Sequence, residues 1–126
     1  MNRAVPFIAS DHLSQLNQWH SIRGLSPVNR GDLPSTGFIV LGIAAGFLYL
    51  TDSNLAFLDG YIANPETTSL ERKPALDLIT DCLMDAAQKA GVKRLVSLSA
   101  NPSIQARSLS SGFTSHGTFQ LFCKEY

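Results

Sequence analysis

The sequence predicts an α+β fold built on a mixed, twisted β-sheet, and two observations support this prediction. Three β-type segments, 37–41, 46–51 and 55–63, follow one another with short, turn-rich links, which is typical of an antiparallel meander. A long helical pattern and then one apolar segment, 95–99, come next. That order predicts a crossover helix that leads back to a parallel strand.

The composition describes one folding domain over residues 1–126. The chain is too short for two ordinary domains, and 44% apolar against 16% charged residues is a globular mixture. Ten basic and ten acidic residues cancel, so we expect no nucleic-acid partner. The longest apolar stretch, 38–50, is broken by Gly42 and Gly46 and falls short of the roughly 18 residues of a membrane span.

The residues at the start of the sequence lack the pattern of an export signal, so we expect a cytoplasmic protein. The spacing of Cys82 and Cys123 suggests neither a disulfide framework nor a metal site. Because free cysteine is among the most buried residue types, we expect both thiols to be buried.

The first part of the chain predicts an edge strand, a helix and a loop. Ala4–Ile8 is a short apolar segment, and Ser10 or Asp11 can cap the helix that follows. The helix is indicated by helical spacing of Leu13, Leu16, Trp19 and Ile22, and Gly24 ends it. Residues 25–36 are rich in Pro, Asn, Gly, Asp and Ser, which predicts a loop that is mobile or that covers something.

Asp59-Gly60 lies inside the third β-type segment and allows two interpretations. It can be the two-residue turn of a hairpin, or a bulge within one strand. Strands of three residues on either side are short for a stable hairpin, so we favour the bulge.

The second half predicts a long helix, a parallel strand, a short helix and a final strand. Pro74 suits the first turn of the long helix and Gly91 its end. Its apolar stripe consists of Ala75, Ile79, Cys82, Leu83, Ala86 and Ala90. The strand 95–99 follows, then a helix from Pro102 to Leu109 and an alternating strand over 118–124.

Three local features accompany this order of elements: Ile62-Ala63-Asn64-Pro65-Glu66, Gly91-Val92-Lys93-Arg94-Leu95, and Asn101-Pro102 with Gly112-Phe113. Together they resemble the GNAT superfamily of acyl-CoA-dependent N-acyltransferases over roughly residues 4–124. The Ser-x-Glu-Arg-Lys segment at 69–73 looks like that of compact GNAT-like bacteriophage proteins.

The resemblance implies acetyl-CoA as cosubstrate and places three residues beside its pantetheine arm. In the family, the fourth strand splays from the fifth and offers free backbone groups to pantetheine, which here implies Ile62 and Ala63. Asn101, at the end of the next strand, is expected to reach the same arm, although an asparagine there is also a plain helix cap.

The family's pyrophosphate loop, Q/R-x-x-G-x-G/A, is altered in this chain. Ala75 matches the second small position, but Lys73 replaces the first glycine and Leu70 the leading residue. Arg72 and Lys73 can pair with a diphosphate, or they can simply solvate the start of a helix.

The resemblance also implies catalytic positions. Ser108 stands where the family commonly has the tyrosine that protonates the departing thiolate, and a serine hydroxyl is a much poorer proton donor. Asp59 and Glu66 are the candidate bases, although the first can be a bulge residue and the second a loop or cap carboxylate. We expect surface or core-edge positions for His12, His20 and His116.

Two functions remain open after these comparisons of motifs. The first is an acetyl-CoA-dependent N-acetyltransferase that acts on a small-molecule or protein amine; exposed strand edges would allow a homodimer. The second is a GNAT-like scaffold that has lost catalysis and serves as a binding or structural protein. A ferredoxin-type binding module is disfavoured because a meander precedes the crossover.

Overall fold

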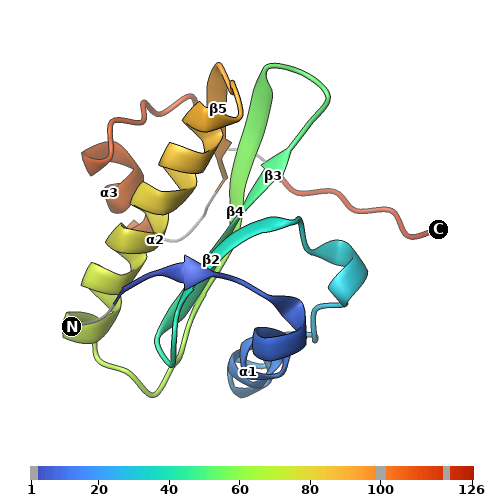
Figure 1. Cartoon of the computed structure of the whole chain (residues 1–126), viewed down its shortest axis with the longest axis vertical. Coiled ribbons are helices and arrows are strands. Elements are labelled where there is room, and N and C mark those ends of the chain that lie inside the picture. The colour runs from blue at the N-terminus through green and yellow to red at the C-terminus, as the bar shows by residue number, and fades with distance from the viewer. Residues whose placement is uncertain (1–2, 99–101, 118–119) are drawn as a thin grey trace.

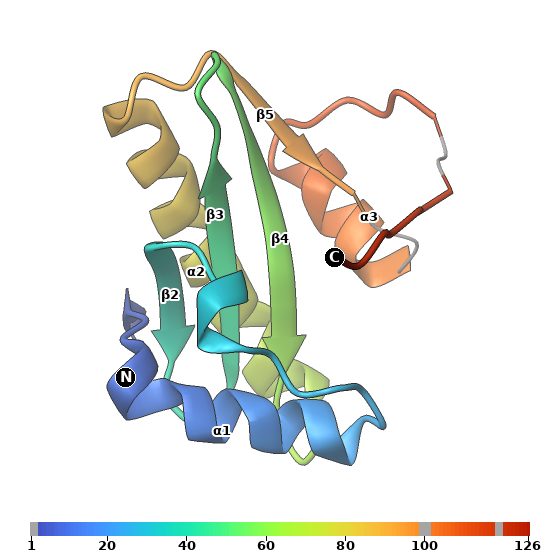
Figure 2. The ribbon, with the colours of Figure 1, turned by 90° about the vertical axis from the view of Figure 1, so that its right-hand side faces the viewer.

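A five-stranded sheet lies between α1 on one face and α2 on the other in the computed structural model, which describes residues 3–98, 102–117 and 120–126 (Figure 1). Helix α1 crosses the ends of the central strands, and α3 lies beyond β5 (Figure 2). The elements are β1 Val5–Pro6, α1 Ala9–Ile22, the 3-10 helix η1 Arg30–Asp32, β2 Thr36–Val40, β3 Ala44–Leu50, β4 Leu55–Ala63, α2 Ser69–Lys89, β5 Arg94–Ser97 and α3 Pro102–Ser110.

The sheet confirms the predicted mixture of antiparallel and parallel strands. Its order is β1-β2-β3-β4-β5, with antiparallel pairing as far as β4 and parallel pairing between β4 and β5. Helix α2 joins the parallel pair, as a crossover must.

Strand β4 contains the predicted bulge. Ala45 of β3 lies opposite Ile62, whereas Phe47 lies opposite Asp59, so β4 carries one extra residue at this point. Gly60 has a φ of +70°, a left-handed conformation that favours glycine. The bulge is confirmed, and the alternative of a hairpin turn is wrong.

The two faces of the sheet bury separate apolar clusters. Helix α2 covers the larger cluster: Val40, Ile43, Ala44, Leu48, Ala56, Leu58, Ala75, Ile79, Leu83 and Ala87. Helix α1 covers the other: Leu16, Trp19, Ile39, Ala45, Phe47 and Ile62. The predicted stripes are therefore confirmed in their middle parts, because Leu16, Trp19, Ala75, Ile79 and Leu83 are buried. Their ends differ: Ile22 and Ala90 are exposed, and Ala87 is buried instead.

Helix α2 begins at Ser69, so the prediction of a start near Pro74 is wrong. Thr68 and Glu71 form a capping box, in which the Glu71 N–H donates to Thr68 Oγ1 at 3.3 Å and the Thr68 N–H donates to Glu71 Oε1 at 3.1 Å. The added first turn is exposed, so it is held by its cap rather than by packing. Pro74 consequently lies inside the helix.

Other boundaries also differ from the predictions. Helix α1 has no side-chain cap at Ser10 or Asp11; it begins at Ala9, and the Ile8 N–H donates to His12 Nδ1 at 2.9 Å. The described part of the expected last strand, 120–124, is exposed and contains no strand, because it lies against no sheet edge (Figure 1). Cys123 in that segment is exposed and Cys82 is half-buried, so the prediction of two buried thiols is wrong.

Candidate active site

Strand β4 separates from β5 halfway along its length. The parallel pairing runs from Leu55 opposite Arg94 to Leu58 opposite Ser97, and β4 then continues to Ala63 with only β3 as a partner among the described strands. The N–H of Asn64 donates to the Ile43 carbonyl beside β3, so strand alternation directs the Ala63 carbonyl to the open edge. There it accepts a hydrogen bond at 3.0 Å from Nε of Arg23, the residue that follows α1.

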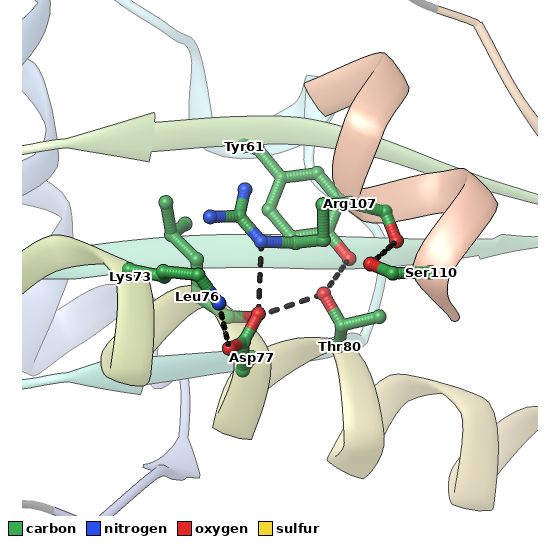
Figure 3. A network of polar contacts seen from close by, with 7 residues as sticks. All are labelled: Tyr61, Lys73, Leu76, Asp77, Thr80, Arg107 and Ser110. Carbon is green, nitrogen blue, oxygen red and sulfur yellow. Dashed lines mark hydrogen bonds and ion pairs between the residues drawn. The ribbon is translucent and has the colours of Figure 1, made fainter. Parts of the chain in front are cut away.

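A narrow groove lies beside this separation, between β4, α2 and α3 (Figure 3). It is lined by Leu58, Tyr61, Thr80, Ser97, Ile104, Arg107, Ser108, Ser111 and Phe113. Its volume is about 20 Å³, which is room for roughly one water molecule. The groove is therefore almost closed by its own side chains.

Asp77 of α2 forms two ion pairs, one with Arg107 of α3 and one with Lys73 of its own helix, and only the first connects α3 to α2 (Figure 3). Arg107 Nε donates to Asp77 Oδ1 at 3.1 Å, and Lys73 Nζ lies 3.3 Å from Asp77 Oδ2. Arg107 is only 14% exposed, whereas Asp77 is 45% exposed. Because water reaches the carboxylate, we expect the pair to contribute about 1 kcal/mol or less.

Tyr61 places a phenol in the same groove. Thr80 Oγ1 uses its hydrogen to donate to the Leu76 carbonyl at 2.8 Å, so Tyr61 donates in its 3.0 Å contact with Thr80. Burial raises the pKa of Tyr61, and the positive charge of Arg107 has a smaller opposing effect. The Tyr61 ring fits because residue 46 is glycine: a Cβ there would lie 2.8 Å from Tyr61 Cε1.

The amino end of α2 is closed by the protein's own groups. Beyond the capping box, Asn64 binds the preceding turn, since its Oδ1 accepts from the Glu66 N–H at 3.0 Å and its carbonyl from Thr67 Oγ1 at 2.6 Å. The carboxylate of Glu71 therefore occupies the position that the helix dipole makes favourable for an anion.

A second hollow, of about 280 Å³, lies on the α1 face of the sheet. It is lined by Leu16, His20, Pro27, Val28, Asp32, Leu33, Phe47, Tyr49 and Gly60. Gly60 and Tyr61 are consecutive, so the bulge of β4 separates this hollow from the groove on the other face. Segment 25–36 forms its outer wall, which agrees with the prediction of a covering loop.

The predicted site residues fall into separate places. Asp59 is exposed at the bulge, where Oδ1 accepts from the Gly60 N–H at 2.8 Å, and Glu66 is exposed in the turn before α2. Ser108 lies in the groove with Tyr61 and Arg107. Ile62 is buried under α1, and Ala75 under α2.

The remaining predicted residues lie on α2 or outside the described chain. Arg72 is half-buried and Lys73 is exposed, and both belong to the first turns of α2 rather than to a loop. Asn101 lies outside the described residues.

Sequence reasoning missed Tyr61, Arg107 and Asp32, and it assigned His20 only a surface or core-edge position. Tyr61 directly follows the bulge glycine, and this position in the sequence could have indicated a functional role for it. The other three come from segments whose proximity depends on the tertiary fold. Among the described residues no cluster of His, Cys, Asp and Glu could hold a metal ion, and no helix is long and apolar enough to cross a membrane.

The chain matches no protein-family profile and no curated protein by sequence. Its structure matches the aminoglycoside N-acetyltransferase AAC(6')-Iy, in complex with a bisubstrate analog of CoA and acetylneamine, with a TM-score of 0.70 and 14% identity over 100% of this chain and 99% of that one. The chain has the fold of the GNAT acetyltransferases.

Two further solved structures match nearly the whole chain. An acetyltransferase of Trypanosoma brucei has a TM-score of 0.69 and 10% identity, over 98% of this chain and 100% of that one. The protein TTHA1254 of Thermus thermophilus has a TM-score of 0.66 and 18% identity, over 98% of this chain and 96% of that one. The predicted GNAT-like fold is thereby confirmed.

Proposed function

We propose that this chain is an acetyl-CoA-dependent N-acetyltransferase that acts on an amine. The observation that carries the proposal is the open edge of β4 from Asp59 to Ala63, flanked by α2 and α3. Backbone groups that leave a sheet ladder must find other partners, and an extended pantetheine arm supplies them. The likeness to acetyltransferases along the whole fold supports this assignment.

The cofactor groove opens in this proposal by movement of α3. A volume of about 20 Å³ cannot admit a pantetheine arm, so α3 separates from α2 when acetyl-CoA binds. The Arg107–Asp77 pair is the contact that must break, and it is partly exposed. At the open edge, Arg23 leaves the Ala63 carbonyl and pantetheine replaces it.

The amine approaches from the α1 face, through the bulge of β4. Its nitrogen attacks the thioester carbonyl, the new C–N bond forms, and the C–S bond breaks to release a thiolate. Asp59, at the bulge, is the candidate base for the ammonium proton; Glu66 lines neither hollow. Tyr61 is the candidate acid for the thiolate, because its phenol shares the groove with Ser108, the weaker donor.

Arg72 and Lys73 are the proposed partners of the diphosphate. The capping box occupies the amino end of α2, so these side chains, rather than free N–H groups, supply the attraction.

Thermal unfolding with and without acetyl-CoA tests the proposal. A ligand at 100 times its dissociation constant adds roughly 2.7 kcal/mol to stability. Lys73→Glu should abolish this gain. Lys89→Glu is the matched control, because it makes the same change of charge on the same helix and also breaks an i,i+4 ion pair. Lys89 Nζ lies 2.9 Å from Asp85 Oδ2, near the other end of α2. An equal gain in both variants would refute the placement of the diphosphate.

Turnover tests the role of Tyr61. With acetyl-CoA and an amine, Tyr61→Phe should lower kcat by about 10²-fold or more while acetyl-CoA still stabilises the protein. An unchanged kcat would show that Tyr61 does not act as the acid. Ser108→Ala tests the second hydroxyl group of the groove in the same assay.

A second candidate function is a scaffold without catalysis, of the kind suggested by the resemblance to compact bacteriophage proteins. The nearly closed groove and the self-capped start of α2 favour it, because the groove has little free space and the cap already bonds the N–H of Glu71. The absence of any stabilisation by millimolar acetyl-CoA or CoA would select this function over the enzyme.

A further inference from the structure

The hollow on the α1 face combines an apolar wall with a small set of polar groups. Of its nine lining residues, Leu16, Leu33 and Phe47 are packed in the apolar cluster under α1, and Pro27 and Val28 close the outer side. His20, Asp32 and Tyr49 supply the polar side chains of the lining. Ligand sites typically show this combination, and about 280 Å³ lies near the small end of their size range.

The polar side chains of this hollow carry no positive charge. His20 Nδ1 is buried out of reach of solvent and has no hydrogen-bond partner among the described residues. Burial also lowers the pKa of His20, so the imidazole is neutral at pH 7. Asp32 adds a carboxylate.

Two carboxylates make the electrostatic potential around Tyr49, in the lining of the hollow, more negative. Burial, followed by the charges of Asp59 and Asp32, raises the pKa of Tyr49. Both carboxylates therefore act on the same phenol, which lies beside Gly60 at the bulge. A cation with several N–H donors matches this set of groups in charge and in hydrogen bonding.

The outer wall of the hollow is fixed before any ligand arrives. The amide of Asn17, on α1, donates from Nδ2 to the Val28 carbonyl at 3.1 Å and accepts from the Val28 N–H at Oδ1 at 2.7 Å. A preformed wall lowers the entropic loss on binding.

We propose that this hollow binds a primary ammonium group on a small apolar body, of the phenylalkylamine class. The apolar body lies against Leu16, Leu33 and Phe47, and the ammonium group donates to Asp32. The inference rests on the proposed function, in which this molecule is the acetyl acceptor and its nitrogen lies next to the bulge.

The test is a calorimetric titration of the full chain with phenethylamine, in the absence of acetyl-CoA. Phenethyl alcohol, which has the same apolar body without the charge, should bind at least tenfold more weakly. Asp32→Asn should weaken amine binding about tenfold or more, because a charged hydrogen bond is lost. Asp52→Asn, an exposed carboxylate in the β3–β4 turn, is the matched control and should leave binding unchanged.

A second variant probes the cavity itself. Val28→Phe fills the hollow without a change of charge and should abolish the binding of the amine. Equal binding of amine and alcohol, or undiminished amine binding by Asp32→Asn, would overturn the inference.

The two proposals fail separately. If the amine binds and the variants weaken its binding as expected, but acetyl-CoA does not stabilise the protein, this inference is supported and the proposed enzymatic function is refuted. A protein that acetyl-CoA stabilises but phenethylamine does not bind keeps the enzyme and refutes this acceptor class.

Discussion

Asn17→Ala should release the wall of the α1-face hollow and destabilise the protein by about 2 kcal/mol. The substitution removes two hydrogen bonds to Val28, at 3.1 and 2.7 Å, and each such bond contributes roughly 1 kcal/mol. Val28 is half-buried between exposed neighbours, so water can reach its freed backbone groups and no large desolvation penalty adds to the loss. The melting temperature should fall on the order of 6 to 10 °C.

Asn17→Asp is the diagnostic partner of this variant. An aspartate keeps the oxygen that accepts from the Val28 N–H but loses the amide donor to the Val28 carbonyl. It should lose about half as much stability as the alanine variant.

Urea unfolding measures both losses, and hydrogen exchange locates them. The Val28 amide should exchange faster in Asn17→Ala, whereas the Ile79 amide in the middle of α2 should retain its protection at matched stability. Unchanged exchange at Val28, or equal losses in the two variants, would refute the reasoning.

Three further outcomes follow from the packing and the titrating groups. Gly46→Ala should cost about 1 to 3 kcal/mol, because its Cβ would meet a buried ring at 2.8 Å, whereas Gly31→Ala, with no heavy atom within 4 Å, should be nearly neutral in the same urea titration. Burial lowers the pKa of His20, so the unfolded chain binds a proton at a higher pH than the folded protein. The free energy of unfolding should therefore fall as the pH drops below about 6.5. His20→Gln should make this fall less steep, and an unchanged dependence on pH would contradict the role of His20. Iodoacetamide should label exposed Cys123 before Cys82, whose pKa is raised by burial, and equal labelling rates would contradict this.

Local patterns were sufficient to predict most of the sheet. The segment 55–63 is a strand with these bounds, and its bulge follows from Asp59-Gly60, because a left-handed residue inside a strand is a local feature. The first turn of α2 escaped prediction because it has no apolar stripe, although Thr68 and Glu71 carry the spacing of a capping box. The last strand was wrongly predicted because alternation describes one chain segment, whereas a strand also needs a partner edge.

The candidate site was less accessible to sequence reasoning. Ser108 could be placed by its distance from a motif, but the phenol beside it comes from β4, 47 positions earlier in the chain. His20 and Asp32 meet only because segment 25–36 folds back over α1 and β3. Proximity of this kind depends on tertiary packing, which no local spacing contains.

The capping box at Thr68 and Glu71 has a consequence for the protein in the cell. Since Thr68 and Glu71 cap α2 with the protein's own groups, the first turn of this helix should form before any anion binds. Acetyl-CoA would then add its binding free energy to a helix that is already complete. A fall in its supply should lower the stability of the folded protein without unfolding that turn.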